Sequence, residues 1–205
     1  DKVHEYERMK IRILNGGHAI IAYAGALLGC ELVDEAMAHP LVHAFLRKVE
    51  EQEVLPHVHP VPDFTPPEYL ELIDERFSNP AVKDTTRRLC LDGSNRQPKF
   101  IVPSILDGLK AGASVTGLAL ESALWCRYCA GHFEDGREIA PNDPDWDRLV
   151  ALSAEARTRP AAWLEQRTVY GDLASNLHFA ALFSGWLDRL SADGVQKTLE
   201  AYLAD

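Results

Sequence analysis

The stretch HEYERMKIRILNGGHAIIAYAGALLG, residues 4–29, predicts one long helix or two abutting helices. Its apolar side chains recur at helical spacing, which places them on a common face; they are Ile11, Leu14, Ile20, Tyr23, Leu27 and Leu28. The pair Gly16-Gly17 interrupts the pattern. Because a glycine in a helix interior costs about 1 kcal/mol, we expect a kink at this pair.

Helical periodicity continues through the rest of the chain, with turn signals between the segments. Further helices are predicted over residues 33–55, 68–77, 82–91, 100–111, 114–130, 145–156, 160–166, 173–190 and 193–203. The segment 114–130 is nearly apolar, so we expect it at the centre. Strand-like alternation is confined to 31–33 and 137–140. The sequence predicts a mainly α, multi-helix globular domain over residues 1–205, with at most a small β-hairpin.

Composition and charge exclude several classes of protein. Of 205 residues, 46% are hydrophobic and 25% charged, which is typical of a globular domain and not of a disordered chain. The net charge of −10 disfavours binding to nucleic acid or to an anionic membrane surface. The longest apolar run, 19–29, is half the ~20 residues that a membrane span needs. We therefore expect a cytoplasmic protein with neither nucleic acid nor membrane as a partner.

Two features suggest that the chain belongs to something larger. It begins at Asp1 rather than Met, as we expect of a piece of a longer protein. It also contains no Gly-x-Gly-x-x-Gly motif after a strand and no Walker loop, so it shows no nucleotide cradle of its own.

Lys10, Asn15 and His18 are the first candidates for chemistry. At ~100° per residue, Lys10 and His18 lie about 80° apart on an α-helix, and Asn15 lies about 140° from Lys10 and 60° from His18. A desolvated lysine can act as a general base, an amide donor can stabilise an alkoxide, and an imidazole can orient a hydroxyl. Spacing alone fits better the structural alternative, a surface lysine and a half-buried histidine on an amphipathic helix.

A second group of candidates collects basic side chains around a predicted turn. Arg87 and Arg88 precede the segment DGSNRQPK, residues 92–99, which contains Arg96. Guanidinium donors suit an anionic or polyhydroxylated ligand. The structural alternative is a solvated turn with a basic rim.

Metal and redox sites are weaker hypotheses. His39 and His43 have the i, i+4 spacing of a helical zinc pair, but no third ligand is evident. Cys126 and Cys129 form a CxxC pair in a nearly apolar helix, outside the βαβ context of a redox site. We expect no metal and buried, reduced thiols.

Three motifs carry a resemblance to a known family. Residues 10–18, KIRILNGGH, followed by AYAG at 22–25, resemble the central signature of the polyol-specific long-chain dehydrogenases, the mannitol dehydrogenase family. RFSNP at 76–80 is similar to a second motif of that family. DTTRRL at 84–89 and DGSNRQPKF at 92–100 are similar to a third. The family also contains arabinitol dehydrogenase and the fructuronate and tagaturonate reductases.

This resemblance implies a two-domain enzyme that works without a metal. An N-terminal Rossmann-type domain would bind NAD or NADP, and a helical C-terminal domain would supply the substrate site. The chain resembles the C-terminal domain alone, so its own N-terminal nucleotide-binding domain and a small polyol or ketose are the expected partners. The implied reaction is oxidation of mannitol or a related sugar alcohol to the 2-ketose. The alternatives are half of a hexuronate reductase and a stand-alone, non-enzymatic helical binding domain.

The resemblance also assigns roles to individual residues. Lys10 matches the family's catalytic lysine, the general base in alcohol oxidation. Asn15 matches an asparagine that hydrogen-bonds the reacting oxygen, and His18 a histidine that positions the substrate. Arg88 matches a substrate-binding arginine. Arg96 stands where many relatives have a lysine, and we expect it to bind substrate as well.

Overall fold

The computed structural model describes residues 2–205, and nearly all of their regular structure is helical. The described residues otherwise contain only isolated β-bridges, which pair Leu32 with Thr85, Val61 with Phe64 and His132 with Glu138. The bridge between His132 and Glu138 closes a short hairpin-like turn, and Glu138 lies within the predicted strand 137–140. The prediction of a mainly α, multi-helix domain with at most a small hairpin is confirmed.

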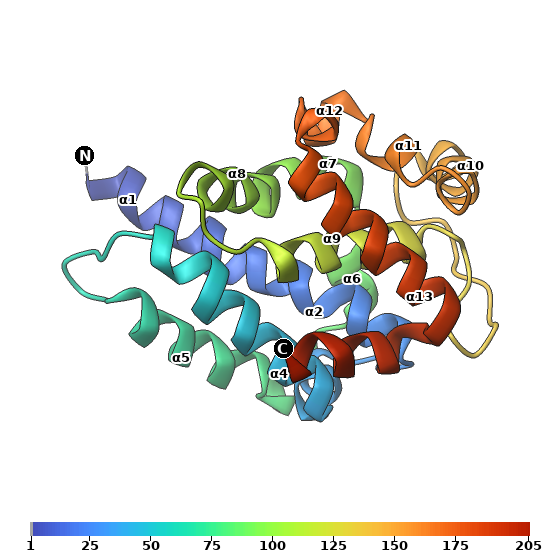
Figure 1. Cartoon of the computed structure of the whole chain (residues 1–205). Helices are drawn as coiled ribbons and strands as arrows, with labels where there is room; N and C mark the ends of the chain where they lie inside the picture. Colours follow the sequence, from blue (N-terminus) through green and yellow to red (C-terminus); the bar gives the residue numbers. More distant parts are fainter. Residues whose placement is uncertain (1) are drawn as a thin grey trace.

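The N-terminal third begins with one continuous helical rod (Figure 1). It consists of α1 (Lys2–Met9), a π-helical segment η1 (Lys10–Asn15) and α2 (Gly16–Leu27). The prediction of a kink at Gly16-Gly17 is wrong, because the helix is irregular at another place and for another reason. Gly16 has ordinary helical dihedrals, φ −61° and ψ −43°. The irregularity is instead the wide turn before it, in which the Gly16 N–H donates to the Ile11 carbonyl.

Close packing explains the glycine pair. A Cβ on Gly17 would lie 3.3 Å from Glu50 Oε1 and 3.3 Å from Phe77 Cε2. A Cβ on Gly16 would lie 3.2 Å from the Phe100 carbonyl oxygen. The absence of side chains here lets three other segments approach the rod.

Two helices, α2 and α9 (Thr116–Tyr128), are buried on almost every side and form the centre. The C-terminal helix α13 (Leu177–Ala204), drawn in red in Figure 1, packs along α9. Helices α4 (Pro40–Val49) and α6 (Thr86–Cys90) pack against α2. The nearly apolar sequence of 114–130 thus correctly predicts a central helix.

The remaining elements cover this centre. They are α3 (Val33–Ala38), η2 (Glu50–Val54), η3 (Leu55–His57), α5 (Pro66–Phe77), η4 (Pro80–Val82), α7 (Gly93–Phe100), α8 (Val102–Lys110), α10 (Trp146–Ala156), α11 (Ala161–Leu164), α12 (Arg167–Tyr170) and η5 (Leu173–Ser175).

Several predicted boundaries differ from the structure. The helix predicted over 33–55 is broken at His39, which is extended (φ −76°, ψ 118°) because Pro40 follows it. The segment 92–99 is not a turn but most of α7, entered through Asp92 in a left-handed conformation. Of the two helices predicted over 173–190 and 193–203, the first begins later, at Leu177, and the break between them lies within α13 at Gly194 (φ 84°, ψ 175°).

A buried carboxylate caps the central helix α9. Glu53 accepts hydrogen bonds from the backbone N–H groups of Gly117 and Leu118, at distances from 2.8 to 3.1 Å. The Tyr202 hydroxyl donates to Glu53 Oε2 at 3.1 Å, and Lys48 Nζ donates to the Tyr202 carbonyl at 2.7 Å. This network fixes the end of α13 to the start of α9.

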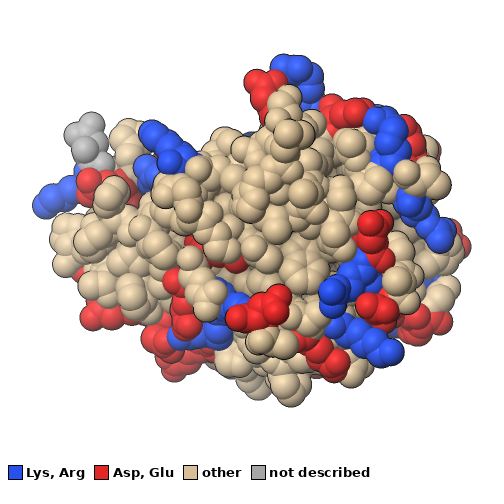
Figure 2. Space-filling view, in the orientation of Figure 1, with Lys and Arg blue, Asp and Glu red and all other residues tan. Residues whose placement is uncertain are grey.

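The surface carries mixed charge. On the face shown in Figure 2, acidic and basic side chains alternate around the rim of a large uncharged area, and no extended basic patch interrupts it. None of the described helices combines the length and the apolar content that crossing a bilayer would require.

Candidate functional site

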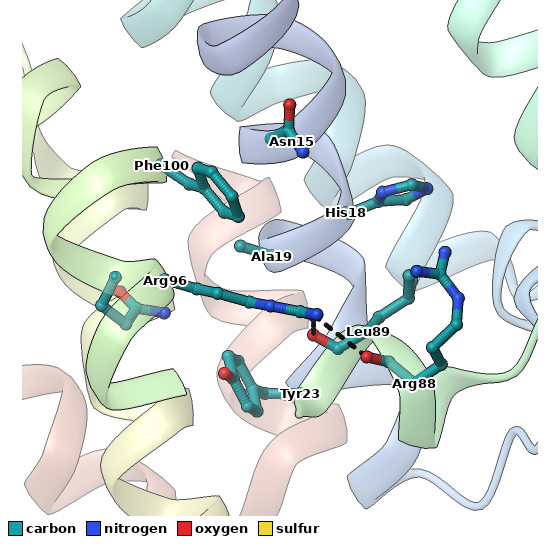
Figure 3. A pocket seen from close by; sticks show the side chains of 9 residues that line it. Asn15, His18, Ala19, Tyr23, Arg88, Leu89, Arg96 and Phe100 are labelled. Atoms are coloured by element: carbon teal, nitrogen blue, oxygen red, sulfur yellow. Dashed lines mark hydrogen bonds between the residues drawn. The ribbon is translucent and has the colours of Figure 1, made fainter. Parts of the chain in front are cut away.

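A small pocket of about 110 Å³ lies between the start of α2 and the helices α6 and α7 (Figure 3). Asn15 and His18 reach it from the N-terminal rod, Arg88 from α6 and Arg96 from α7. Its lining residues are Asn15, His18, Ala19, Tyr23, Arg88, Leu89, Arg96, Gln97 and Phe100. Four of the five candidate residues therefore meet at one place.

Lys10, the fifth candidate, is not among the lining residues, and its side chain is exposed. Because it is exposed, residues 2–205 do not supply the burial that a lysine general base needs. The π-helical turn does improve its relation to Asn15. Because such a turn closes with i→i+5 hydrogen bonds, residues five apart hold the relation that residues four apart hold in an α-helix. Lys10 and Asn15 thus lie nearer to a common face than the predicted 140°.

The imidazole of His18 stacks on the ring of Phe77, with ring centroids 4.3 Å apart and planes 16° from parallel. The pKa of His18 is lowered from 6.5 to about 4, mainly by burial and then by the positive charge of Arg88, while Asp84 opposes the shift. The imidazole is therefore neutral at neutral pH. It can orient a hydroxyl by hydrogen bonding but is poorly suited to deliver a proton.

Arg88 is held by Asp84 through a bidentate ion pair. Its Nε donates to Asp84 Oδ1 at 2.6 Å, and its Nη2 donates to Asp84 Oδ2. This hydrogen bonding lowers the pKa of Asp84 and raises that of Arg88. Arg87 points elsewhere, since its guanidinium donates to the carbonyls of Ala140 and Pro141. Adjacent residues diverge by about 100° around a helix, which explains why only Arg88 reaches the pocket.

Arg96 crosses the base of the pocket in Figure 3 and ends at the C-terminal carbonyls of α6. Its Nη1 donates to the carbonyl of Arg88 at 3.0 Å and to that of Leu89 at 3.4 Å. Cations stabilise helix C-termini in this way. Arg96 therefore ties α7 to α6 and also lines the pocket. It lies on a helix and not in the turn that the sequence predicts.

Sequence reasoning missed a buried polar pair beneath the pocket. Gln97 Nε2 donates to Glu121 Oε1, while Gln97 Oε1 and Glu121 Oε2 have no partner within the described chain. Burial raises the pKa of Glu121 to about 8, so this side chain is protonated at neutral pH. The only sign of this pair in the sequence is that Glu121 is a charged residue in a nearly apolar segment.

A second, smaller cavity of about 50 Å³ continues on the other side of His18. His18 and Arg88 line both cavities. The second is also lined by Asp34, Arg76, Phe77, Asn79 and Asp84, and by Val33 and Val82. The motif RFSNP at 76–80, to which the sequence assigns no role, thus supplies part of the surroundings of His18.

The weaker hypotheses find no support. His39 Nδ1 accepts the Leu41 N–H at the start of α4, and His43 Nε2 lies 2.7 Å from Asp74 Oδ2. Cys126 and Cys129 are buried and free, and burial raises the pKa of both thiols. Across residues 2–205 no group of three or more His, Cys, Asp or Glu side chains could hold a metal ion.

The pocket combines guanidinium donors, a carboxamide and a neutral imidazole with the apolar side chains of Ala19, Leu89 and Phe100. Such a lining suits a small molecule with several hydroxyl groups, because each polar side chain can pair with one oxygen.

The family model for the mannitol dehydrogenase C-terminal domain matches residues 2–191 of this chain. The chain belongs to the mannitol dehydrogenase C-terminal domain family. Its curated relatives in this family include mannitol 2-dehydrogenase of Cereibacter sphaeroides, 58% identical over 98% of this chain and 42% of that protein. Mannitol 2-dehydrogenase of Aspergillus terreus is 34% identical over 98% of this chain and 40% of that protein. The mannitol dehydrogenase domain described here thus spans about two fifths of their length.

Solved structures agree with this membership. The ternary complex of Pseudomonas fluorescens mannitol 2-dehydrogenase with NAD and D-mannitol matches with a TM-score of 0.96 and 33% identity, over 100% of this chain and 42% of that one. A substrate-free D-sorbitol dehydrogenase shares the fold, with a TM-score of 0.87 at 22% identity, over 96% of this chain and 41% of that one. The resemblance inferred from the three sequence motifs is confirmed.

Proposed function

We propose that this chain is the substrate-binding and catalytic half of an NAD(P)-dependent polyol dehydrogenase, which oxidises mannitol or a related sugar alcohol to the 2-ketose. The observation that carries the proposal is the convergence of Asn15, His18, Arg88 and Arg96 on one pocket. These residues come from two stretches that are distant in sequence, 15–18 and 88–96, and each lies in a motif that resembles one of the family. The relatives named as mannitol 2-dehydrogenases support the same reaction.

In this mechanism the chain's residues bind and deprotonate the alcohol. The amine of Lys10 takes the hydroxyl proton, and the Asn15 carboxamide donates a hydrogen bond to the oxygen as negative charge develops there. The neutral His18 fixes a neighbouring hydroxyl of the substrate. The N–H groups of Arg88 and Arg96 bind the substrate oxygens that lie further along its carbon chain. When bound, a nicotinamide cofactor would supply the acceptor for the hydride.

The residues described here fit a substrate half better than a nucleotide site. The pocket provides hydrogen-bonding groups for a polyol, whereas the sequence contains no glycine-rich phosphate loop. We propose that a separate nucleotide-binding domain holds the cofactor and covers Lys10. Such cover would supply the desolvation of the lysine that residues 2–205 do not provide. We place the enzyme in the cytoplasm, without a metal.

One observation favours the second candidate, a hexuronate reductase. Three guanidinium groups, those of Arg88, Arg76 and Arg96, act on His18 and lower its pKa. Guanidinium groups of this kind would attract a substrate that carries a carboxylate, although Asp84 acts on His18 in the opposite direction.

The test is an NAD-linked assay of mannitol oxidation, run on this chain and on the full-length protein. We expect activity in the full-length protein alone, and a loss of turnover of at least about 100-fold in its Lys10→Ala variant with nucleotide binding unchanged. Lys2→Ala is the matched control, because Lys2 is exposed on the same helical rod.

Near-normal turnover of Lys10→Ala would refute the role of Lys10. Inactivity of the full-length protein on mannitol and fructose, with activity on fructuronate, would favour the reductase. Inactivity on all of them would favour a binding domain.

A further inference from the structure

The charge of the pocket wall decides whether an uncharged polyol or ketose, or a substrate that carries a carboxylate, fits better. The side chain that sets this charge next to the pocket is Asp84, the residue before the N-cap of α6. Asp84 also lines the smaller cavity behind His18. Its carboxylate side chain is only 16% exposed, so solvent screens it weakly.

Asp84 is itself rigidly placed. Its Oδ1 accepts the Thr85 N–H at 2.8 Å in addition to Arg88 Nε, and its backbone carbonyl accepts the Val33 N–H at 3.0 Å. The carboxylate is therefore fixed by the start of α6 and by α3. An arginine that pairs with it in bidentate geometry is held in one orientation.

Two of the five N–H groups of Arg88 are engaged by Asp84. Three remain available for hydrogen bonds, and Arg88 lines both cavities. Hydrogen bonds from these groups can be accepted by hydroxyl or by carboxylate oxygens, so donor number alone does not select between substrates.

Charge does select between them. With Asp84 ionised, the Arg88–Asp84 pair is neutral, and a carboxylate bound at Arg88 would also meet the negative charge of Asp84. The other charged groups around these cavities are Asp34 and Arg76, whose charges offset each other at the smaller cavity, and Arg96, whose guanidinium donates to two backbone carbonyls. His18 adds no charge at neutral pH.

We propose that Asp84 is a positioning and specificity-determining residue: it orients Arg88 toward the pocket and cancels its charge, so that the site takes an uncharged, hydroxylated substrate in preference to a carboxylated one. The proposal rests on the proposed function and narrows its substrate class to polyols and neutral ketoses.

The experiment compares fructose with fructuronate, which bears a carboxylate at the end remote from the ketone, as substrates for NADH-linked reduction by the full-length enzyme. In each reaction a hydride from NADH and a proton convert the ketone to a secondary alcohol. Asp84→Asn keeps an acceptor for Arg88 but removes the charge, whereas Asp84→Ala removes both. Arg87→Gln is the matched control, because Arg87 is adjacent and does not line the pocket.

We expect Asp84→Asn to raise the ratio of kcat/KM for fructuronate to that for fructose at least tenfold. Asp84→Ala should raise the KM for fructose at least tenfold with kcat changed less than threefold. Arg87→Gln should leave both quantities unchanged. In an Arg88→Gln background the effect of Asp84→Asn on the ratio should vanish, which a merely structural role would not produce.

Two results would overturn the proposal while the wild type reduces fructose: an unchanged substrate ratio in Asp84→Asn, or the same ratio change in the Arg88→Gln background. A wild type that uses neither polyols nor neutral ketoses would instead refute the proposed function, and this inference with it. Thermal unfolding of every variant shows whether it folds. If Asp84→Asn does not fold, Asp84→Ala decides the matter, because an unchanged KM for fructose in that variant would overturn the proposal.

Discussion

The imidazole of His18 lies almost parallel to the phenyl ring of Phe77, at a centroid distance of 4.3 Å. Phe77 is the last residue of α5 and is nearly fully buried, so its ring is a fixed surface against which the imidazole rests. The RFSNP motif thereby acquires a physical role. It sets the plane of a side chain that lies 59 positions earlier in the sequence.

Replacing Phe77 by Leu should impair substrate binding more than turnover. The aliphatic side chain fills much of the space but offers no flat face, so His18 loses its preferred plane. We expect the KM for mannitol in the full-length enzyme to rise about fivefold with kcat nearly unchanged. Phe64→Leu is the control, because Phe64 packs against Tyr69 instead. Equal KM values for the two variants would contradict the prediction.

His18 should make the stability of the chain depend on pH in acid solution. Its pKa is about 4 in the folded chain and near 6.5 when unfolded, so the unfolded state binds more protons between these values. Stability should be full above pH 6.5 and fall toward pH 4, by on the order of 3 kcal/mol from this group. Urea unfolding from pH 7 to 4 measures the slope, and His18→Gln should flatten it. NMR titration of His18 with a midpoint near 6.5 would disprove the assignment.

Glu121 should give the opposite trend, a loss of stability as the pH rises from 4.5 to 8. Its pKa is about 8 in the folded chain and near 4.5 when unfolded, so the folded state holds the extra proton between these values. Stability should therefore fall as the pH rises from 4.5 to 8, and the full penalty persists above pH 8. Glu121→Gln keeps an oxygen for Gln97 and should raise Tm at pH 9 by several degrees, with little change at pH 5. Thermal melts at both pH values check this, and parallel melting curves at the two would refute it.

Arg96 should affect stability as well as binding, because it joins α7 to the end of α6. Arg96→Met removes two hydrogen bonds to backbone carbonyls and should destabilise the chain by about 1 kcal/mol. It should also raise the KM for mannitol severalfold, since the α6 helix that carries Arg88 loses an anchor. Arg96→Lys retains one donor and should fall between Met and the wild type. A Met variant that binds mannitol normally would contradict this dual role.

Much of the fold could be predicted from the sequence, because hydrophobic periodicity and the residues that start or end helices indicate local structure directly. The double proline at 66–67 after Thr65 correctly indicates a helix start, and the structure shows a capping box from Thr65 to Glu68. The break at Pro40 follows from the restriction on the preceding residue, which the long apolar pattern of 33–55 obscured. The helix at 93–100 was missed because Asp-Gly-Ser-Asn favours turns locally, whereas Trp125 and Tyr23 pack directly over Gly93.

The site was less accessible, because its arrangement depends on long-range packing. Motifs predicted Asn15, His18, Arg88 and Arg96, and the structure brings these four together. Nothing in the sequence indicated that Phe77 would stack on His18. The spacing of Asp84 and Arg88 at i, i+4 did contain a signal for their ion pair.

The π-helical turn from Lys10 to Asn15 amounts to one residue inserted into an otherwise regular helix. Deleting a single residue inside it, such as Arg12, would let the rod close as a plain α-helix. Everything before the deletion would then be rotated and shifted relative to Asn15 and His18. The number of residues between Lys10 and Asn15, and not only their identity, therefore sets the geometry of the candidate site. Alignments that slide a gap through 10–15 would misplace the lysine.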